Sequence, residues 1–182
     1  MIHWALWTLA GLLLAGVVHL GTVLMLPRTA TLDSYARLAP IAPVNTVAPV
    51  PPASAENALV PFTDPAFVAA VCRYDLSAGP LKLTAPVTPA YTSVTFYNRR
   101  GVAYYALNDR AAGRRVIELD LMTEQQKAEL PEEEDVTAAD RLIVESPTPT
   151  GLIVLRALAP EPGMVTRAQE VLAQAKCQVQ AP

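Results

Sequence analysis

The hydrophobic pattern changes twice along the chain and divides it into three parts. An uninterrupted apolar run from Trp4 to Leu26 contains no Asp, Glu, Lys or Arg. Between residues 72 and 158, several segments alternate apolar and polar positions with the period of two that is typical of half-buried β-strands. Residues 161–176 then repeat apolar positions at helical spacing. The pattern predicts a membrane-spanning helix, a β-rich domain and a final amphipathic helix.

The apolar run predicts a transmembrane anchor over residues 1–28. Its length is sufficient to cross a bilayer core, and Trp4 and Trp7 lie where an interfacial aromatic belt is expected. A cleaved signal peptide is the alternative. Against it, the residues that precede Trp4 include no Lys or Arg, and no A-x-A cleavage site follows the apolar run. We therefore expect a retained single span that contacts membrane lipid through residues 4–26.

The charges beside the span give opposing indications of its orientation. Arg28 and Arg37 follow the span, whereas only the amino terminus and His3 precede it, so the positive-inside rule favours a cytoplasmic domain. Exported domains that stay anchored, however, also begin with a few residues followed by an uncleaved apolar segment. This pattern favours a domain outside the cytoplasm. The cysteines bear on this choice.

One face of the predicted span is suited to association within the membrane. Gly11, Ala15 and Thr22 fall on this face with His19 beside them, and small residues four apart allow helices to pack closely. An ionisable residue inside a span is a functional candidate. The alternative for His19 is a neutral side chain near the helix end that bonds a neighbour or a water.

Residues 29–61 are predicted to form a short helix and a proline-rich spacer. Thr31–Leu38 is the candidate helix, with its acidic residue near the start and its basic residue near the end, as the helix dipole prefers. Ala39–Pro61 then contains six prolines, and this density favours an extended, semi-rigid segment. The spacer is expected to hold the domain off the bilayer, although part of it could run along the domain.

The remaining residues, 62–182, are predicted to form an α+β domain: a mainly antiparallel sheet or sandwich with two or three packed helices. The helices are expected just after Asp64-Pro65, where Asp64 would be the N-cap, and over Glu124–Leu130 and Glu161–Lys176. Outside the central hairpin, strands are expected over Cys72–Leu76, Leu81–Ala85 and Arg115–Leu121, with a hairpin formed by Arg141–Glu145 and Leu152–Leu158.

The central hairpin is predicted over Tyr91–Arg110, around an Asn-Arg-Arg-Gly turn. Asn98 can bond its own downstream backbone, and Gly101 accepts a left-handed conformation. A turn at this place pairs Phe96 with Tyr104. Strand alternation then separates an even-numbered core face from an odd-numbered polar face.

The odd-numbered face carries three tyrosines and is the candidate binding surface. It could equally be the seat of a covering helix. The candidate binding residues are Tyr91, Tyr97, Tyr105, Asp109 and Arg110.

The two cysteines, Cys72 and Cys177, lie near opposite ends of the domain sequence. A disulfide between them would close a loop of roughly 105 residues, worth about 4 to 5 kcal/mol by chain entropy. It would also indicate an oxidising compartment and outweigh the two arginines. The alternative is a pair of buried thiols, and two isolated cysteines do not make a structural zinc site.

The residue types that are missing restrict the chemistry of the domain. Both histidines, His3 and His19, lie in or beside the span, so the domain cannot form a Ser-His-Asp triad or a histidine-ligated metal site. No phosphate-binding glycine motif is present. We expect no cofactor and no metal. The net charge of -3 and the lack of a basic stripe argue against nucleic acid.

Four segments resemble a bacterial family of short, singly anchored proteins, the domain of unknown function DUF1254. They are VCRYDLSAGPLKL, YTSVTFYNRRGVAYYALNDR, LIVESPTPTGLIVLRAL and the tail that ends at Cys177. The resemblance implies a Gram-negative inner-membrane protein with a largely β domain outside the cytoplasm, often beside a companion protein of another uncharacterised family. It supports the Cys72–Cys177 bond and supplies no catalytic residues.

Three functions are compatible with these observations. The favoured one is a non-enzymatic, anchored periplasmic domain that binds a partner protein or an envelope component. The second is an envelope enzyme that acts on a glycan-like substrate through carboxylates, with Asp75, Asp109, Glu118 and Glu145 as candidates. The third is a structural membrane subunit that associates through its span.

Overall fold

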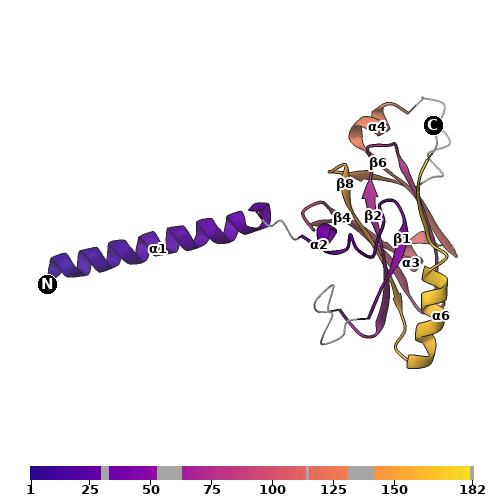
Figure 1. Cartoon of the computed structure of the whole chain (residues 1–182), viewed down its shortest axis with the longest axis horizontal. Coiled ribbons are helices and arrows are strands. Elements are labelled where there is room, and N and C mark those ends of the chain that lie inside the picture. The colour runs from indigo at the N-terminus through magenta and orange to yellow at the C-terminus, as the bar shows by residue number, and fades with distance from the viewer. Residues whose placement is uncertain (30–32, 53–62, 114, 131–141, 181–182) are drawn as a thin grey trace. The chain divides into compact units, whose positions relative to one another are not determined.

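The computed structural model describes residues 1–29, 33–52, 63–113, 115–130 and 142–180. Contacts divide the chain into two compact units, Met1–Asp33 and Ser34–Pro182. The first is helical and the second is a β-rich domain with short helices, so the predicted α+β class is confirmed (Figure 1).

The first unit contains one long helix, α1 (Ile2–Thr29). Its segment Ile2–Leu26 contains an 18-residue window with a mean hydropathy of 2.2 and is therefore long and apolar enough to cross a membrane. The helix continues beyond Pro27, and the Thr29 hydroxyl donates to the carbonyls of Met25 and Leu26. A membrane anchor and a signal sequence both satisfy these properties.

The second unit is a sandwich of two sheets. The strand order in the first, which we call sheet A, is β1-β2-β8-β4-β5, with every neighbouring pair antiparallel. Its strands are β1 (Val47–Val50), β2 (Phe67–Asp75), β8 (Thr150–Leu158), β4 (Thr92–Asn98) and β5 (Ala103–Asn108).

The second sheet, sheet B, has the order β7-β6-β3-β9 and contains one parallel pair, β6 with β7. Its strands are β7 (Leu142–Ser146), β6 (Val116–Thr123), β3 (Leu81–Pro86) and β9 (Lys176–Val179). The short helices of the unit are α2 (Ser34–Arg37), α3 (Asp109–Ala112), α4 (Glu124–Ala128) and α6 (Pro162–Leu172).

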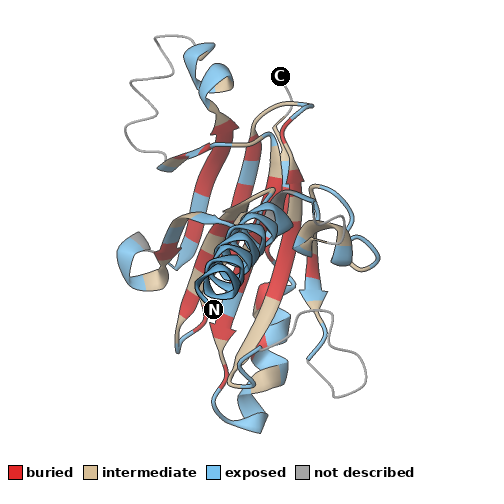
Figure 2. Ribbon diagram, turned by 90° about the vertical axis from the view of Figure 1, so that its left-hand side faces the viewer, coloured by how far each residue is buried: buried red, intermediate tan, exposed pale blue. Residues whose placement is uncertain are grey.

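The main core lies between the two sheets. Figure 2 shows buried residues recurring along the strands, because every second side chain points into the sandwich. Tyr74, Phe96 and Ile153 from sheet A and Leu121 from sheet B are fully buried in this core. The helix α6 covers part of it with Ala168 and Leu172.

A disulfide joins the two sheets. Cys72 on β2 and Cys177 on β9 are bonded across the core, with their Cα atoms 6.5 Å apart. Both residues are buried, at 0% and 2% exposure. The bond therefore holds a strand of one sheet to a strand of the other.

The turn of the central hairpin is confirmed, but its register differs by one residue from the prediction. Gly101 has φ +78°, and the Asn98 side chain accepts from the backbone amide of Val102. A bulge at Phe96/Tyr97 shifts the ladder, so Phe96 pairs with Tyr105 instead of Tyr104. Beyond the bulge, the odd-numbered residues of β5 face the core.

The predicted pairing of Arg141–Glu145 with Leu152–Leu158 is wrong. Strand β7 belongs to sheet B and β8 to sheet A, so the short turn between them crosses from one sheet to the other. Both arms are apolar because each contributes side chains to the core, such as Val144 from β7 and Ile153 from β8. Two strands paired in one hairpin and two strands in different sheets joined by a short turn have the same alternation of apolar and polar residues. The local sequence therefore does not distinguish them.

The short helix predicted after Asp64 is also wrong. The Asp64 carboxylate accepts from the Ala66 amide at 2.9 Å, which is the bond of an isolated turn, and β2 begins at Phe67. The apolar run that follows is buried as a long strand between β1 and β8. A capping signal is shared by turns and helices, and here the tertiary packing selects the strand.

Part of the predicted spacer belongs to the sheet. Val47–Val50 forms the edge strand β1, where Pro49 is tolerated because an edge strand can lack one ladder donor. Residues 53–61 of the predicted spacer lie outside the described residues.

Candidate functional site

The outer face of sheet A, which is turned away from sheet B, carries a second apolar cluster. Alternation along β2 and β8 places Val71, Leu152 and Val154 on this face. Five residues of the cluster are buried and five more pack around them. This outer cluster consists of Leu38, Ala42, Ala48, Val71 and Leu152, with Tyr35, Ile41, Val50, Tyr97 and Val154.

Residues 34–46, which we call the covering segment, lie on this outer face. Leu38 and Ala42 are buried there, at 3% and 0% exposure. Asn45, in a left-handed conformation with φ 55°, fixes the segment to β2. Its amide donates to the Arg73 carbonyl at 2.7 Å, and its side chain donates to the Asp75 carbonyl and accepts from the Asp75 amide.

Two arginines stack on one tyrosine of the covering segment. The guanidinium carbons of Arg73 and Arg99 lie 4.2 and 4.4 Å from the centroid of the Tyr35 ring. Each is within the range of a cation–π interaction. Arg73 also donates to the Ala42 carbonyl at 3.2 Å, and its Nε is buried without a hydrogen-bond partner among the described residues. Two guanidinium groups therefore meet at this edge of the outer cluster.

A cavity of about 230 Å³ opens beside the covering segment. Its wall is mostly apolar, and its polar side chains include the Tyr97 phenol and the exposed Arg156 guanidinium. The volume is below the roughly 300–1,000 Å³ of sites that enclose a whole small ligand. This outer cavity is lined by Ser34, Leu38, Val50, Thr63, Ala69, Val71, Tyr97, Gly101, Leu152, Val154 and Arg156.

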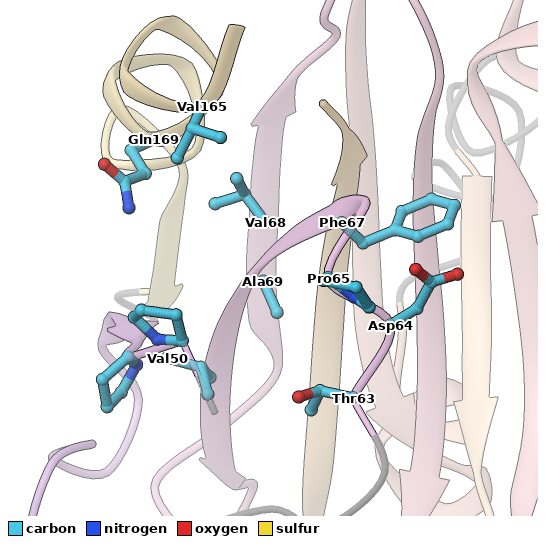
Figure 3. A pocket seen from close by; sticks show the side chains of 11 residues that line it. Val50, Thr63, Asp64, Pro65, Phe67, Val68, Ala69, Val165 and Gln169 are labelled. Atoms are coloured by element: carbon cyan, nitrogen blue, oxygen red, sulfur yellow. The ribbon is translucent and has the colours of Figure 1, made fainter. Parts of the chain in front are cut away.

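A second cavity, of about 210 Å³, lies between β2 and α6 (Figure 3). Val165 and Gln169 of α6 line one side of it, and Val68 lies opposite them. The Asp64 carboxylate on its wall is already engaged by the Ala66 amide. Unlike the outer cavity, this cavity has no arginine or lysine among the described residues of its wall.

The structure does not place the three predicted binding tyrosines on one face. Tyr97 packs in the outer cluster, whereas Tyr105 packs on the core side against Phe96, with ring centroids 5.9 Å apart. Tyr91 makes an edge-to-face contact with Phe67 at 6.3 Å. The bulge in the hairpin is the reason, because it reverses the alternation of β5 relative to β4.

Asp109 and Arg110 lie in α3, outside the lining of the outer cavity. Asp109 is the first residue of that helix, and its carboxylate accepts from the Thr92 amide at 3.4 Å. Arg110 is exposed. Sequence reasoning missed Arg73, Arg99 and Arg156, which the fold brings to the outer cluster.

The other candidate carboxylates lie on separate elements. Asp75 ends β2 and accepts from the amide and hydroxyl of Ser77, and these bonds lower the pKa of its carboxyl. Glu145 on β7 pairs with Lys127 at 3.5 Å, and Glu118 is exposed on β6. Within the part of the chain that is described, no group of three His, Cys, Asp or Glu is arranged to hold a metal ion.

A buried polar cluster lies where β7 passes to β8. The Tyr74 hydroxyl is 2.9 Å from the Ser146 hydroxyl and 3.3 Å from that of Tyr104, and it donates to the Tyr97 carbonyl. Burial raises the pKa of Tyr104 well above its ordinary value. The Tyr104 phenol therefore remains a neutral donor and acceptor at physiological pH. The cluster fixes the crossing between the two sheets.

The predicted association face lies on α1. Gly11, Ala15, His19 and Thr22 are all exposed along the helix. The Thr22 hydroxyl donates to the carbonyls of Val18 and His19, at 3.1 and 2.8 Å, so its polar group is satisfied within the helix. Helix association through this face stays a prediction.

A family model with the description "Protein of unknown function (DUF1254)" matches residues 44–179. The match begins within the covering segment and ends with the last residue of β9, so it includes both sheets. No curated protein matches the chain.

Two crystal structures share the fold at low sequence identity. The VPA0106 protein from Vibrio parahaemolyticus matches with 13% identity and a TM-score of 0.59, over 80% of this chain and 34% of that one. An uncharacterized protein from Burkholderia cenocepacia matches with 15% identity and a TM-score of 0.50, over 79% of this chain and 36% of that one. The chain thus spans about a third of the length of each of these proteins.

Proposed function

The chain belongs to the DUF1254 family of proteins of unknown function, and on this premise we propose that it is a single-pass inner-membrane protein whose periplasmic domain binds a partner protein. The observation that carries the proposal is the disulfide that crosses the sandwich of a chain with an apolar N-terminal helix. Disulfides persist in oxidising compartments such as the bacterial periplasm. The helix then acts as the anchor.

The partner is inferred from the length of the structural relatives. In both, the matching fold accounts for about a third of the chain. In those proteins the sandwich is thus part of a larger structure, and we infer that the sandwich of this chain likewise contacts another polypeptide. Residues 34–182 supply the surface for it, and the anchor raises its local concentration at the membrane.

The location is tested with engineered cysteines, because the native pair is buried and bonded. Thr166 is exposed on α6, and Thr166→Cys should react with a membrane-impermeant maleimide in intact spheroplasts. Ile2→Cys, at the other end of α1, should react only after lysis. The intact mass of the purified protein should include residues 1–26, because the anchor is retained.

The reverse labelling pattern would place the domain in the cytoplasm and overturn the location. A mass without the apolar helix would identify that helix as a cleaved signal. The chain with only its native cysteines is the control for background reaction, which should be near zero without denaturant because both cysteines are buried.

The partner is tested by photo-crosslinking in native membranes. A photoactivatable residue at Val102 or at Met164, which are 59% and 40% exposed, should give a discrete adduct with one other protein. The adduct should persist when α1 is replaced by an unrelated anchor, because the sandwich makes the contact. Loss of the adduct on this exchange would identify a subunit that associates through its span, and failure at both positions would count against a partner.

A further inference from the structure

We propose that the outer cavity binds part of one acyl chain of an anionic phospholipid, with the lipid phosphate facing Arg156. The inference rests on the proposed membrane anchoring and adds a ligand to the domain. It depends on the chemistry of the cavity wall, on the charges beside it and on the length of chain that joins it to α1.

The cavity wall has the composition expected for an amphiphile. Val71, Leu152 and Val154 form an apolar floor on the outer face of sheet A, and Leu38 of the covering segment adds to it. Arg156 is exposed and lines the same cavity. The transfer of a hydrocarbon chain from water to such an apolar surface lowers its free energy. The guanidinium can then bond a phosphate that stays in solvent.

The size of the cavity limits how much lipid it can hold. About 230 Å³ is too small to enclose a whole phospholipid. It suits part of one acyl chain. The second chain and the headgroup would then remain outside, as in a lipid that is partly drawn out of the bilayer.

The charges beside the cavity favour an anionic headgroup. Arg73 and Arg99 stack on Tyr35, which stands between the wall residues Ser34 and Leu38 in the covering segment. The chain as a whole is acidic, with a net charge of -3, so its average charge does not attract anionic lipid. Screening restricts charge effects to about 8 to 10 Å, so the Arg156 guanidinium, which lines the cavity, affects a bound headgroup more than the average charge of the chain does.

Few residues separate the covering segment from α1 along the chain. Ser34 follows Thr29, the last residue of α1, by five residues. Five residues span at most about 18 Å even when fully extended. The sandwich is therefore joined to the anchor by a short covalent link, which supports a ligand drawn from the same membrane.

The test uses the full chain in nanodiscs that contain a phospholipid with a photoactivatable acyl chain. With a phosphatidylglycerol headgroup, we expect adducts on peptides from residues 34–38 or 152–156, in addition to those on α1. Val154→Phe, which fills the floor, should reduce the sandwich adducts at least fivefold and leave those on α1 unchanged. With a phosphatidylcholine headgroup, the sandwich adducts should be several-fold weaker.

Arg156→Gln should reduce the preference for phosphatidylglycerol about fivefold, which is the effect of one basic residue near an anionic surface. Arg167→Gln, on an exposed turn of α6, is the matched control and should change nothing. Both substitutions are at exposed positions, so the test does not depend on how the fold tolerates Val154→Phe.

Four outcomes would overturn the proposal. Adducts confined to α1 would exclude the cavity and leave the anchoring intact, whereas adducts on neither part would contradict the anchoring itself. Equal labelling of the sandwich by both headgroups would exclude the role of Arg156. A photoactivatable residue at Tyr97 should gain a lipid-sized mass in native membranes, and a covalent dimer or an adduct with another protein would show that a polypeptide occupies the cavity.

Discussion

The double variant Cys72→Ala/Cys177→Ala is expected to lose about 4 to 5 kcal/mol of unfolding free energy, because the disulfide closes a loop of 105 residues. The whole stability of a domain is typically about 5–15 kcal/mol, so this loss is a large part of it. The midpoint of urea unfolding measures the loss, with near-ultraviolet circular dichroism of the tyrosines as the signal. All six tyrosines lie in residues 34–182, and both tryptophans lie in α1, so the signal reports the sandwich.

The control for this variant is the native chain under reducing conditions. Reduction should lower the midpoint by a similar amount, because both treatments restore the same freedom to the unfolded chain. A loss below about 1 kcal/mol in both would contradict the structural role of the bond. Destabilisation of the double variant alone would instead assign the effect to the packing of the two side chains, which are buried between the sheets.

Sequence patterns predicted the positions of the strands along the chain better than the pairing of one strand with another. The Asn98–Gly101 turn follows from local chemistry, and the buried faces of β4 and β6 follow from alternation. The register of the hairpin does not, because one bulged residue shifts β5 and no local signal marks it. Which sheet each of β7 and β8 joins is likewise decided by distant strands.

The candidate site illustrates the same limit. Tyr97 was predicted as a binding residue and does line the outer cavity. The covering segment lies on the outer face of sheet A, and this packing brings together Arg73, Arg99 and Tyr35. The contact was not predicted because the prolines of this segment favoured an extended spacer. Apolar residues at helical spacing, from Tyr35 through Leu38 to Ala42, are the signal that could have indicated a packed segment.

Gly151→Ala is expected to destabilise the sandwich by about 2 to 4 kcal/mol, as overpacking combined with a broken hydrogen bond. A Cβ at this position would fall on the Tyr74 hydroxyl and on the Tyr97 carbonyl. Gly151 is buried in β8, paired with Tyr74 on one side and with Asn98 on the other, so neither strand can retreat without losing ladder bonds. The urea midpoint of the full chain measures the effect.

The matched control is Gly163→Ala near the start of α6, where a Cβ meets no atom within 4 Å. It should be neutral or stabilise by up to about 1 kcal/mol, because alanine is the better helix former. A second variant tests the contact with the hydroxyl. Adding Tyr74→Phe to Gly151→Ala removes the hydroxyl but leaves the ring carbon Cζ of residue 74 and the Tyr97 carbonyl, so stability should recover only in part. Full recovery would mean that the hydroxyl alone requires the glycine, and equal stability of Gly151→Ala and the native chain would refute the close packing of β8 against β2 and β4.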